Sequence, residues 1–420
     1  MISKKISIFL LLLTTFVAIE AQKNLDINLQ YQWKYLEFQF PSAAVRDSAI
    51  RNGQYIQGNS FPIDIDVYYG ATPPLLFVTM PRFFDGTPFT LGTITGANAA
   101  GGPVIAPFPD YNWQQTGNCN GFTNVFRVFV DSYQRLWVLD SGVINDIQVC
   151  PAKLVMFDLR STSIPPFVHI FPNSLYRTMS LFITPVVDVR NGYDSMVYIA
   201  DVTGFGIIVF DYKNNRSWRT ESQSTHLKPL QQYSNFVIGG ESFNLMDGVF
   251  GLALSPKTYT NRQLFFHSLA SAAESRIPLS VLDNVNYWPA QNPITNPNQF
   301  VQMGLRETTQ TTVQAMDNNG NLFFGTVYPP GIGCWDSNTL YTNANLRLVA
   351  RNDANLQFIS GLKIVTNKSG YQELWVLSCR FQKIMAGTRR QDQYNYRVHK
   401  VLISDLLNGS TRCNGIAMPR

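Results

Sequence analysis

A short hydrophobic pattern recurs six times along the chain and constrains its fold more than any other feature. Each copy consists of an aliphatic residue, an aromatic residue and a further hydrophobic residue. The aromatic residues of successive copies lie 60, 61, 67, 58 and 52 residues apart. A period of this length is typical of arrays in which one supersecondary unit is repeated. The triplets are Leu76–Val78, Leu136–Val138, Val197–Ile199, Leu264–Phe266, Leu322–Phe324 and Leu374–Val376.

Most triplets follow another apolar segment through a polar turn, so each repeat contains at least a β-hairpin. Phe126–Val130 precedes the turn at Asp131, and Val313–Met316 precedes the turn at Asn318–Gly320. Further strand-like segments follow several triplets, as at Ile207–Phe210. Each repeat therefore contains about four short strands.

Repeated four-stranded units predict an all-β fold, a six-bladed β-propeller, because radial repetition hides the edges of the sheets. A single triplet would indicate only an ordinary buried strand, and the even recurrence is what favours the propeller. A β-sandwich would need fewer strands, and a parallel β-helix would show a shorter period. Residues 31–40 precede the first triplet, and residues 31–38 alternate like a strand. We expect this segment to close the ring by adding to the last blade.

The first 21 residues have the pattern of a secretory signal peptide. Lys4 and Lys5 precede the apolar run Ile6–Ile19, which is too short to span a bilayer and ends near the small residue Ala21. No later stretch approaches the 18 apolar residues of a membrane helix. We therefore expect a secreted, extracellular protein without a membrane partner, in which residues 22–420 form one propeller domain.

The charged residues argue against nucleic acid as a partner. The 33 basic residues are scattered, and the longest basic cluster is Arg389-Arg390 beside Asp392. A phosphate backbone requires a contiguous basic surface. Charged residues make up 15% of the chain and aromatic residues 13%, a balance that suits strands packed on both faces.

The common catalytic motifs are absent from the sequence. It contains no Gly-x-Ser-x-Gly, no His-Glu-x-x-His and no Cys-x-x-Cys, and its histidines are dispersed. We expect neither a metal site nor a cofactor, and no catalytic residue can be named. Several aspartates could instead point into a central channel and bind a cation or an amine, although turn and edge hydrogen bonding is the commoner role of Asp. These are Asp64, Asp66, Asp131, Asp188 and Asp201.

Cysteines and glycosylation motifs fit an oxidising compartment. The chain contains five cysteines, an odd number, so one of them is left over from pairing. Acceptors of the Asn-x-Ser/Thr type occur at Asn215, Asn367 and Asn408, each in a polar, turn-like segment. We expect a glycoprotein with glycans at these positions.

Four segments of the chain are specific enough to indicate a family. They are Tyr198–Val202, Asp247–Pro256, Ile332–Trp335 and Asn408–Cys413. With these segments the chain resembles the yellow and major royal jelly protein family of insects, from about Trp33 to Cys413. This resemblance implies a six-bladed propeller, in agreement with the repeat count. Family members are implicated in cuticle pigmentation, some are associated with dopachrome conversion, and related salivary proteins bind small biogenic amines.

The resemblance also places a ligand site at the mouth of the central tunnel, near Ser360, Cys379 and Phe381. Ser360 retains a hydroxyl and Phe381 an aromatic wall, but Cys379 stands where similar proteins typically have Asn. A thiol is a weak hydrogen-bonding group, so weak amine binding is expected. We expect Cys379 to be unpaired and the other four cysteines to form the disulfides Cys119–Cys150 and Cys334–Cys413.

Three interpretations of function remain open. The first, which we favour, is a non-enzymatic binder of small aromatic or amine ligands. The second is an isomerase of the dopachrome-tautomerising kind that acts in cuticle pigmentation. The third is a structural or nutritive extracellular protein without a ligand. Fold similarity alone does not decide between them.

Overall fold

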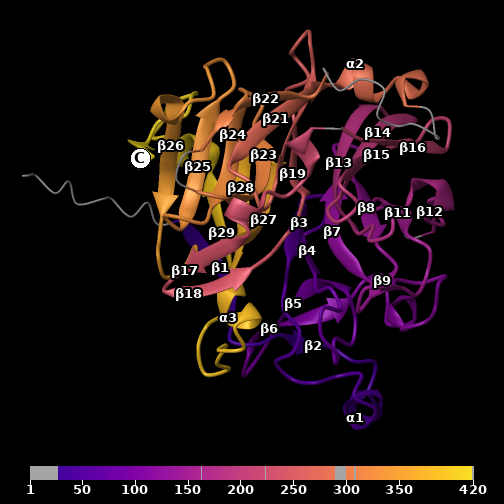
Figure 1. Ribbon diagram of the computed structural model, residues 1–420. Coiled ribbons are helices and arrows are strands. Elements are labelled where there is room, and N and C mark those ends of the chain that lie inside the picture. The colour runs from indigo at the N-terminus through magenta and orange to yellow at the C-terminus, as the bar shows by residue number, and fades with distance from the viewer. Residues whose placement is uncertain (1–26, 162, 223, 289–298, 307–308, 419–420) are drawn as a thin grey trace, which may run out of the picture.

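The structure is a computed structural model that describes residues 27–161, 163–222, 224–288, 299–306 and 309–418. The predicted signal peptide, residues 1–21, lies outside these ranges. The described residues form six four-stranded antiparallel units around a central axis, two of them extended by a fifth strand (Figure 1). The predicted all-β, six-bladed propeller is therefore confirmed.

The innermost strands of the blades form a closed ring. Each inner strand contacts the inner strand of the next blade, and the last contacts the first. They gather in the middle of Figure 1, and their side chains that face the axis line the central tunnel. The inner strands are β3 (Asp64–Tyr68), β7 (Val125–Val130), β13 (Phe182–Asn191), β19 (Val249–Leu254), β23 (Thr311–Met316) and β27 (Phe358–Thr366).

The hydrophobic triplets occupy the second strand of every blade. None of their aromatic rings is more than 6% exposed. A second strand is covered on both faces by the neighbouring blades, so its sequence is continuously apolar instead of alternating. These strands are β4 (Leu75–Thr79), β8 (Arg135–Asp140), β14 (Asp194–Asp201), β20 (Gln263–Ser268), β24 (Asn321–Thr326) and β28 (Gln372–Cys379).

The third and fourth strands complete the blades toward the outside. The third strands are β5 (Leu91–Ala99), β11 (Lys153–Asp158), β15 (Gly206–Asp211), β21 (Ala273–Pro278), β25 (Gly331–Asp336) and β29 (Tyr396–Leu402). The fourth strands are β6 (Gly102–Pro107), β12 (Phe167–Ile170), β16 (Arg216–Thr220), β22 (Val301–Leu305), β26 (Leu346–Arg351) and the N-terminal strand β1 (Asn28–Trp33).

The segment expected to close the ring divides between two blades. Strand β1 pairs antiparallel with β29, which joins the start of the described chain to the last blade. Glu37 and Phe38 form β2, which pairs in parallel with β6 of the first blade. Between them the Lys34 amide donates to the Gly101 carbonyl at 2.7 Å, so the chain crosses from one blade to the next within a few residues.

Several short elements lie outside the four-stranded units. Helix α1 (Ala43–Arg51) begins at Ser42, whose hydroxyl accepts from the Val45 amide. The others are helices α2 (Leu279–Leu282), α3 (Phe381–Met385) and α4 (Ile403–Leu406), the hairpins β9–β10 (Val143–Ile144, Ile147–Gln148) and β17–β18 (Asn235–Ile238, Glu241–Asn244), and strand β30 (Ile416–Ala417) on the edge of β26.

Candidate ligand site in the central tunnel

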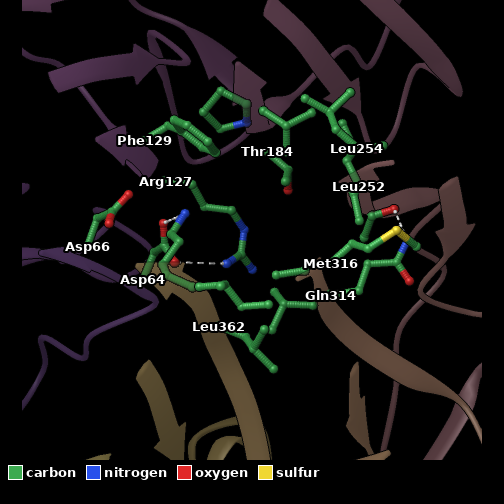
Figure 2. A pocket seen from close by; sticks show the side chains of 18 of the residues that line it. Asp64, Asp66, Arg127, Phe129, Thr184, Leu252, Leu254, Gln314, Met316 and Leu362 are labelled. Atoms are coloured by element: carbon green, nitrogen blue, oxygen red, sulfur yellow. Dashed lines mark hydrogen bonds and ion pairs between the residues drawn. The ribbon is translucent and has the colours of Figure 1, made fainter. Parts of the chain in front are cut away.

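The central tunnel encloses a cavity of about 150 Å³ that is lined by residues from all six inner strands. An apolar cavity of about this volume accommodates one benzene molecule. One part of the wall is charged, and the opposite part is aliphatic. Figure 2 shows Arg127 reaching into the middle, with Asp64 and Asp66 on one side and Leu252 and Leu254 on the other.

The charged part of the wall centres on Asp64, which contacts two cations. Its Oδ2 lies 2.9 Å from Nζ of Lys363, and its Oδ1 lies 3.6 Å from Nη1 of Arg127. The Val128 amide donates to Oδ2 at 3.2 Å. All three charged side chains come from neighbouring inner strands, β3, β7 and β27, so closure of the ring brings them together.

Arg127 is held in place by contacts on several sides. Its Nη1 donates to the Ser360 carbonyl at 2.6 Å, and its guanidinium lies 4.8 Å from the centre of the Phe250 ring. Burial lowers the pKa of Arg127, and the neighbouring Asp64 charge acts in the opposite direction. Its Nε is buried without a hydrogen-bond partner among the described residues.

Burial changes the acidity of Asp66. Burial raises its pKa to about 7, although the positive charge of Lys363 and backbone amides act to lower it. Its two carboxylate oxygens accept from the amides of Val67 at 2.8 Å and Val130 at 2.7 Å. Asp66 therefore changes its charge near neutral pH.

Two further polar side chains line the cavity, Thr184 from β13 and Gln314 from β23. The Thr184 hydroxyl is buried, and no hydrogen-bond partner for it lies within the described parts of the chain. The Gln314 side chain already has two hydrogen-bond partners, His267 at 3.0 Å and Glu274 at 3.1 Å. The aliphatic part of the wall consists of Leu252, Leu254, Val313, Met316 and Leu362.

One end of the tunnel leads to a depression of about 560 Å³, which we call the turn mouth. The turn mouth lies where the inner strands end in hairpin turns. Phe129, Val130, Met316 and Ile364 line both the cavity and the turn mouth, so the two spaces adjoin. Its other lining residues include Tyr69, Lys257, Asn318, Asn367 and Lys368.

The opposite end is covered by phenylalanine rings, which we call the aromatic end. The hairpin β17–β18 leaves the ring between the third and fourth blades, yet its Phe243 contacts Phe381, which follows β28 of the sixth blade, with ring centres 5.4 Å apart. This hairpin therefore reaches across the axis. Phe358 stacks on Phe381 at 4.8 Å, and Phe61 contacts the same ring at 6.2 Å.

The three residues expected to bind a ligand lie together at the aromatic end. Ser360 is on β27, Cys379 ends β28 and Phe381 begins α3, and all three are buried. Burial raises the pKa of the Cys379 thiol to about 12, while the Ser360 hydroxyl and the Arg127 charge lower it in part. None of the three lines the central cavity, and their contact with a ligand stays a prediction.

Of the aspartates proposed for the channel, only Asp64 and Asp66 line the cavity. Asp131 accepts from the amides of its own turn and pairs with Arg135 at 2.7 Å. Asp188 pairs with Arg262, and Asp201 pairs with Arg219 at 2.7 Å. These three carboxylates therefore hold turns and neighbouring strands.

The cysteine pairing is confirmed. Disulfides join Cys119 to Cys150 and Cys334 to Cys413, and Cys379 is a buried free thiol. The three possible glycan acceptors differ in their surroundings. Asn408 is exposed, Asn215 is exposed but bonds His169 at 2.8 Å, and Asn367 caps a turn at the turn mouth.

Arg127, Lys363 and Thr184 were not identified from the sequence. The sequence could have indicated Arg127 and Lys363, because each is the single charged residue of an apolar strand. The two strand segments are Val125–Val130 and Leu362–Val365. A buried charge requires a partner, which indicates a polar interior. No comparable signal marks Thr184, since threonine is common in strands.

No helix in the described part of the chain is long and apolar enough to cross a membrane. Within the same residues, no group of three or more His, Cys, Asp or Glu side chains is arranged to hold a metal ion.

Comparisons with known proteins identify the family. A family model for the major royal jelly proteins matches residues 123–413. Major royal jelly protein 9 of Apis mellifera is 32% identical over 408 residues, which cover 92% of this chain and 89% of the relative. A protein of Drosophila melanogaster named dopaminechrome tautomerase is 31% identical over 407 residues, 94% of this chain and 85% of the relative. The chain therefore belongs to the major royal jelly protein family.

Proposed function

We propose that this protein is secreted and binds a small aromatic molecule in its central tunnel without converting it. The observation that carries the proposal is the cavity of about 150 Å³, which combines an aliphatic wall with buried polar atoms that have no hydrogen-bond partner among the described residues. Ligand pockets typically have this composition, with a few polar groups that orient an otherwise apolar molecule. The volume suits a single ring.

Two disulfides among the described residues support an extracellular location. Disulfides persist outside the cell and are rare in the cytosol. A ligand site that is reached from the turn mouth would then be exposed to small molecules in the surrounding fluid.

A screen by isothermal titration calorimetry tests the proposal. Purified protein is titrated with catecholamines, indoleamines and dopachrome, and any conversion of the added compound is recorded in parallel. We expect binding heat without turnover. Met316→Trp places a bulky ring where the cavity meets the turn mouth, and it should abolish binding, whereas the volume-conserving Met316→Leu should not. Equal binding by both variants would place the ligand elsewhere.

A tautomerase is the second candidate, and Asp66 favours it. Tautomerisation moves a proton between two atoms of the substrate, so it needs a group whose pKa lies near the working pH. The pKa of Asp66 is about 7, and Lys363 and Arg127 lie on the same wall, where they would stabilise a developing oxyanion. The relative named dopaminechrome tautomerase makes this chemistry relevant. Turnover that Asp66→Asn abolishes would establish it, and failure of all ligands to bind would favour a structural or nutritive role.

A further inference from the structure

The polar wall of the tunnel has unused hydrogen-bond donors. Arg127 is 3% exposed and Thr184 is 8% exposed, and both line the cavity. The Nε of Arg127 and the hydroxyl of Thr184 have no partner among the described residues. Lys363 directs two of its three ammonium hydrogens to the Val128 carbonyl at 2.7 Å and to Asp64 at 2.9 Å, and no hydrogen-bond partner for the third lies in the described parts of the chain.

The charge on this wall is also unbalanced. Asp64 faces both Arg127 and Lys363, so one carboxylate serves two cations. Asp66 supplies a second negative charge only when it is ionised, and burial raises its pKa to about 7. The charged groups that face Asp66 are Lys363 and Asp64. While Asp66 is protonated, Asp64, Arg127 and Lys363 carry a net charge of +1, so an anion would neutralise the wall, whereas an ammonium ion would add to its positive charge.

A carboxylate matches these groups in geometry as well as in charge. The planar guanidinium presents pairs of parallel N–H groups, which a carboxylate accepts together. The Phe250 ring lies 4.8 Å from the Arg127 guanidinium, and Nη1 of Arg127 donates to the Ser360 carbonyl. These contacts hold the guanidinium in a fixed orientation before a ligand binds. Across the cavity the aliphatic residues offer a wall for a ring, as Figure 2 shows for Leu252 and Leu254.

We infer that the tunnel site takes a one-ring aromatic carboxylate, with its carboxylate on Arg127 and Thr184 and its ring against the aliphatic wall. This inference rests on the proposed function and specifies the ligand class. The turn mouth, which carries Lys257 and Lys368, is the route of entry. Basic groups at a concave opening attract anions before they bind.

Calorimetry with three probes of one size tests the charge of the ligand. Benzoate, benzyl alcohol and benzylamine are titrated into the intact secreted protein at pH 6.5. We expect benzoate to bind at least ten-fold more tightly than benzylamine. Its affinity should decrease between pH 6 and pH 8, because ionised Asp66 repels the carboxylate. Tighter binding of benzylamine would overturn this inference and leave the proposed function standing, and failure of all three probes to bind would contradict the proposed function itself.

Two variants test the contacts. Thr184→Val replaces the hydroxyl with a methyl group of similar size. It should weaken benzoate binding about five-fold or more and weaken benzyl alcohol binding less. Arg127→Met should remove the preference for benzoate over benzylamine. Arg216→Met, at an exposed arginine of β16, is the matched control and should bind like the unaltered protein. If Arg127→Met does not fold, Thr184→Val decides alone, and benzoate binding that is indifferent to it would overturn the assignment.

Discussion

Asp66→Asn should change how the stability of the protein depends on pH. The unfolded chain releases the Asp66 proton near its ordinary pKa of 3.8, whereas the native protein holds it until about pH 7. The native state is therefore progressively disfavoured as the pH rises between these values. A difference of about three pH units corresponds to about 4 kcal/mol of lost stability above pH 7.

Asp66→Asn removes this loss of stability at high pH but introduces a smaller loss that does not depend on pH. The Asp66 carboxylate accepts from two backbone amides, of Val67 and Val130, and an Asn side chain has only one acceptor oxygen. The amide left without a partner costs about 1–3 kcal/mol. We therefore expect Asp66→Asn to be more stable than the unaltered protein at pH 8, and the advantage to shrink by about 3 kcal/mol between pH 8 and pH 4.5.

Equilibrium urea denaturation with the disulfides intact measures this difference, with tryptophan fluorescence as the probe. Asp405→Asn is the control, because it makes the same chemical change at an exposed position outside the cavity. The account of the cavity is wrong if the difference in unfolding free energy between Asp66→Asn and the unaltered protein does not change with pH. It is also wrong if the variant becomes less stable than the unaltered protein as the pH rises, because Asp66 would then be ionised in the native protein.

Three further predictions concern the cysteines and glycans. If an amine enters the aromatic end and reaches Cys379, Cys379→Asn should strengthen serotonin or dopamine binding at least ten-fold in calorimetry, since an amide oxygen accepts from an ammonium group and adds about 1.5–3 kcal/mol. Tight binding by the unaltered protein that the Asn abolishes would refute this. Replacing Cys334 and Cys413 by Ala should cost about 4 kcal/mol of unfolding free energy, because a long loop is released. An unchanged denaturation midpoint would contradict it. Glycopeptide mapping should find Asn408 occupied, because it is exposed and the folded chain accommodates a glycan there, and an unmodified Asn408 would contradict this.

The fold was predictable because the propeller repeats its most buried strand. Every triplet lies between two neighbouring blades, so burial on both faces keeps all three residues hydrophobic in each repeat. The crossover near Lys34 was not predictable in the same way. Alternation continues from Tyr31 to Phe38 in the sequence, although the chain leaves the last blade after Trp33 and joins the first blade at Glu37.

The site was only partly predictable, because alternation assigns a residue to a face of its strand but does not say what occupies that face. Asp64 and Asp188 both lie on inner strands, yet only Asp64 lines the cavity. Asp188 lies near the end of β13, where Arg262 reaches it. The filling of the aromatic end by Phe243 depends on a hairpin from the far side of the ring, a contact that no local pattern encodes.

The most direct test of a ligand-binding tunnel is a crystal structure of the protein with 3-bromobenzoate. The anomalous signal of bromine locates the ring independently of any assumption about the site. We predict one bromine position inside the tunnel, on the side of Leu252 and Met316, with the carboxylate on Arg127. Bromine at another site, or an empty tunnel at saturating ligand, would contradict the account.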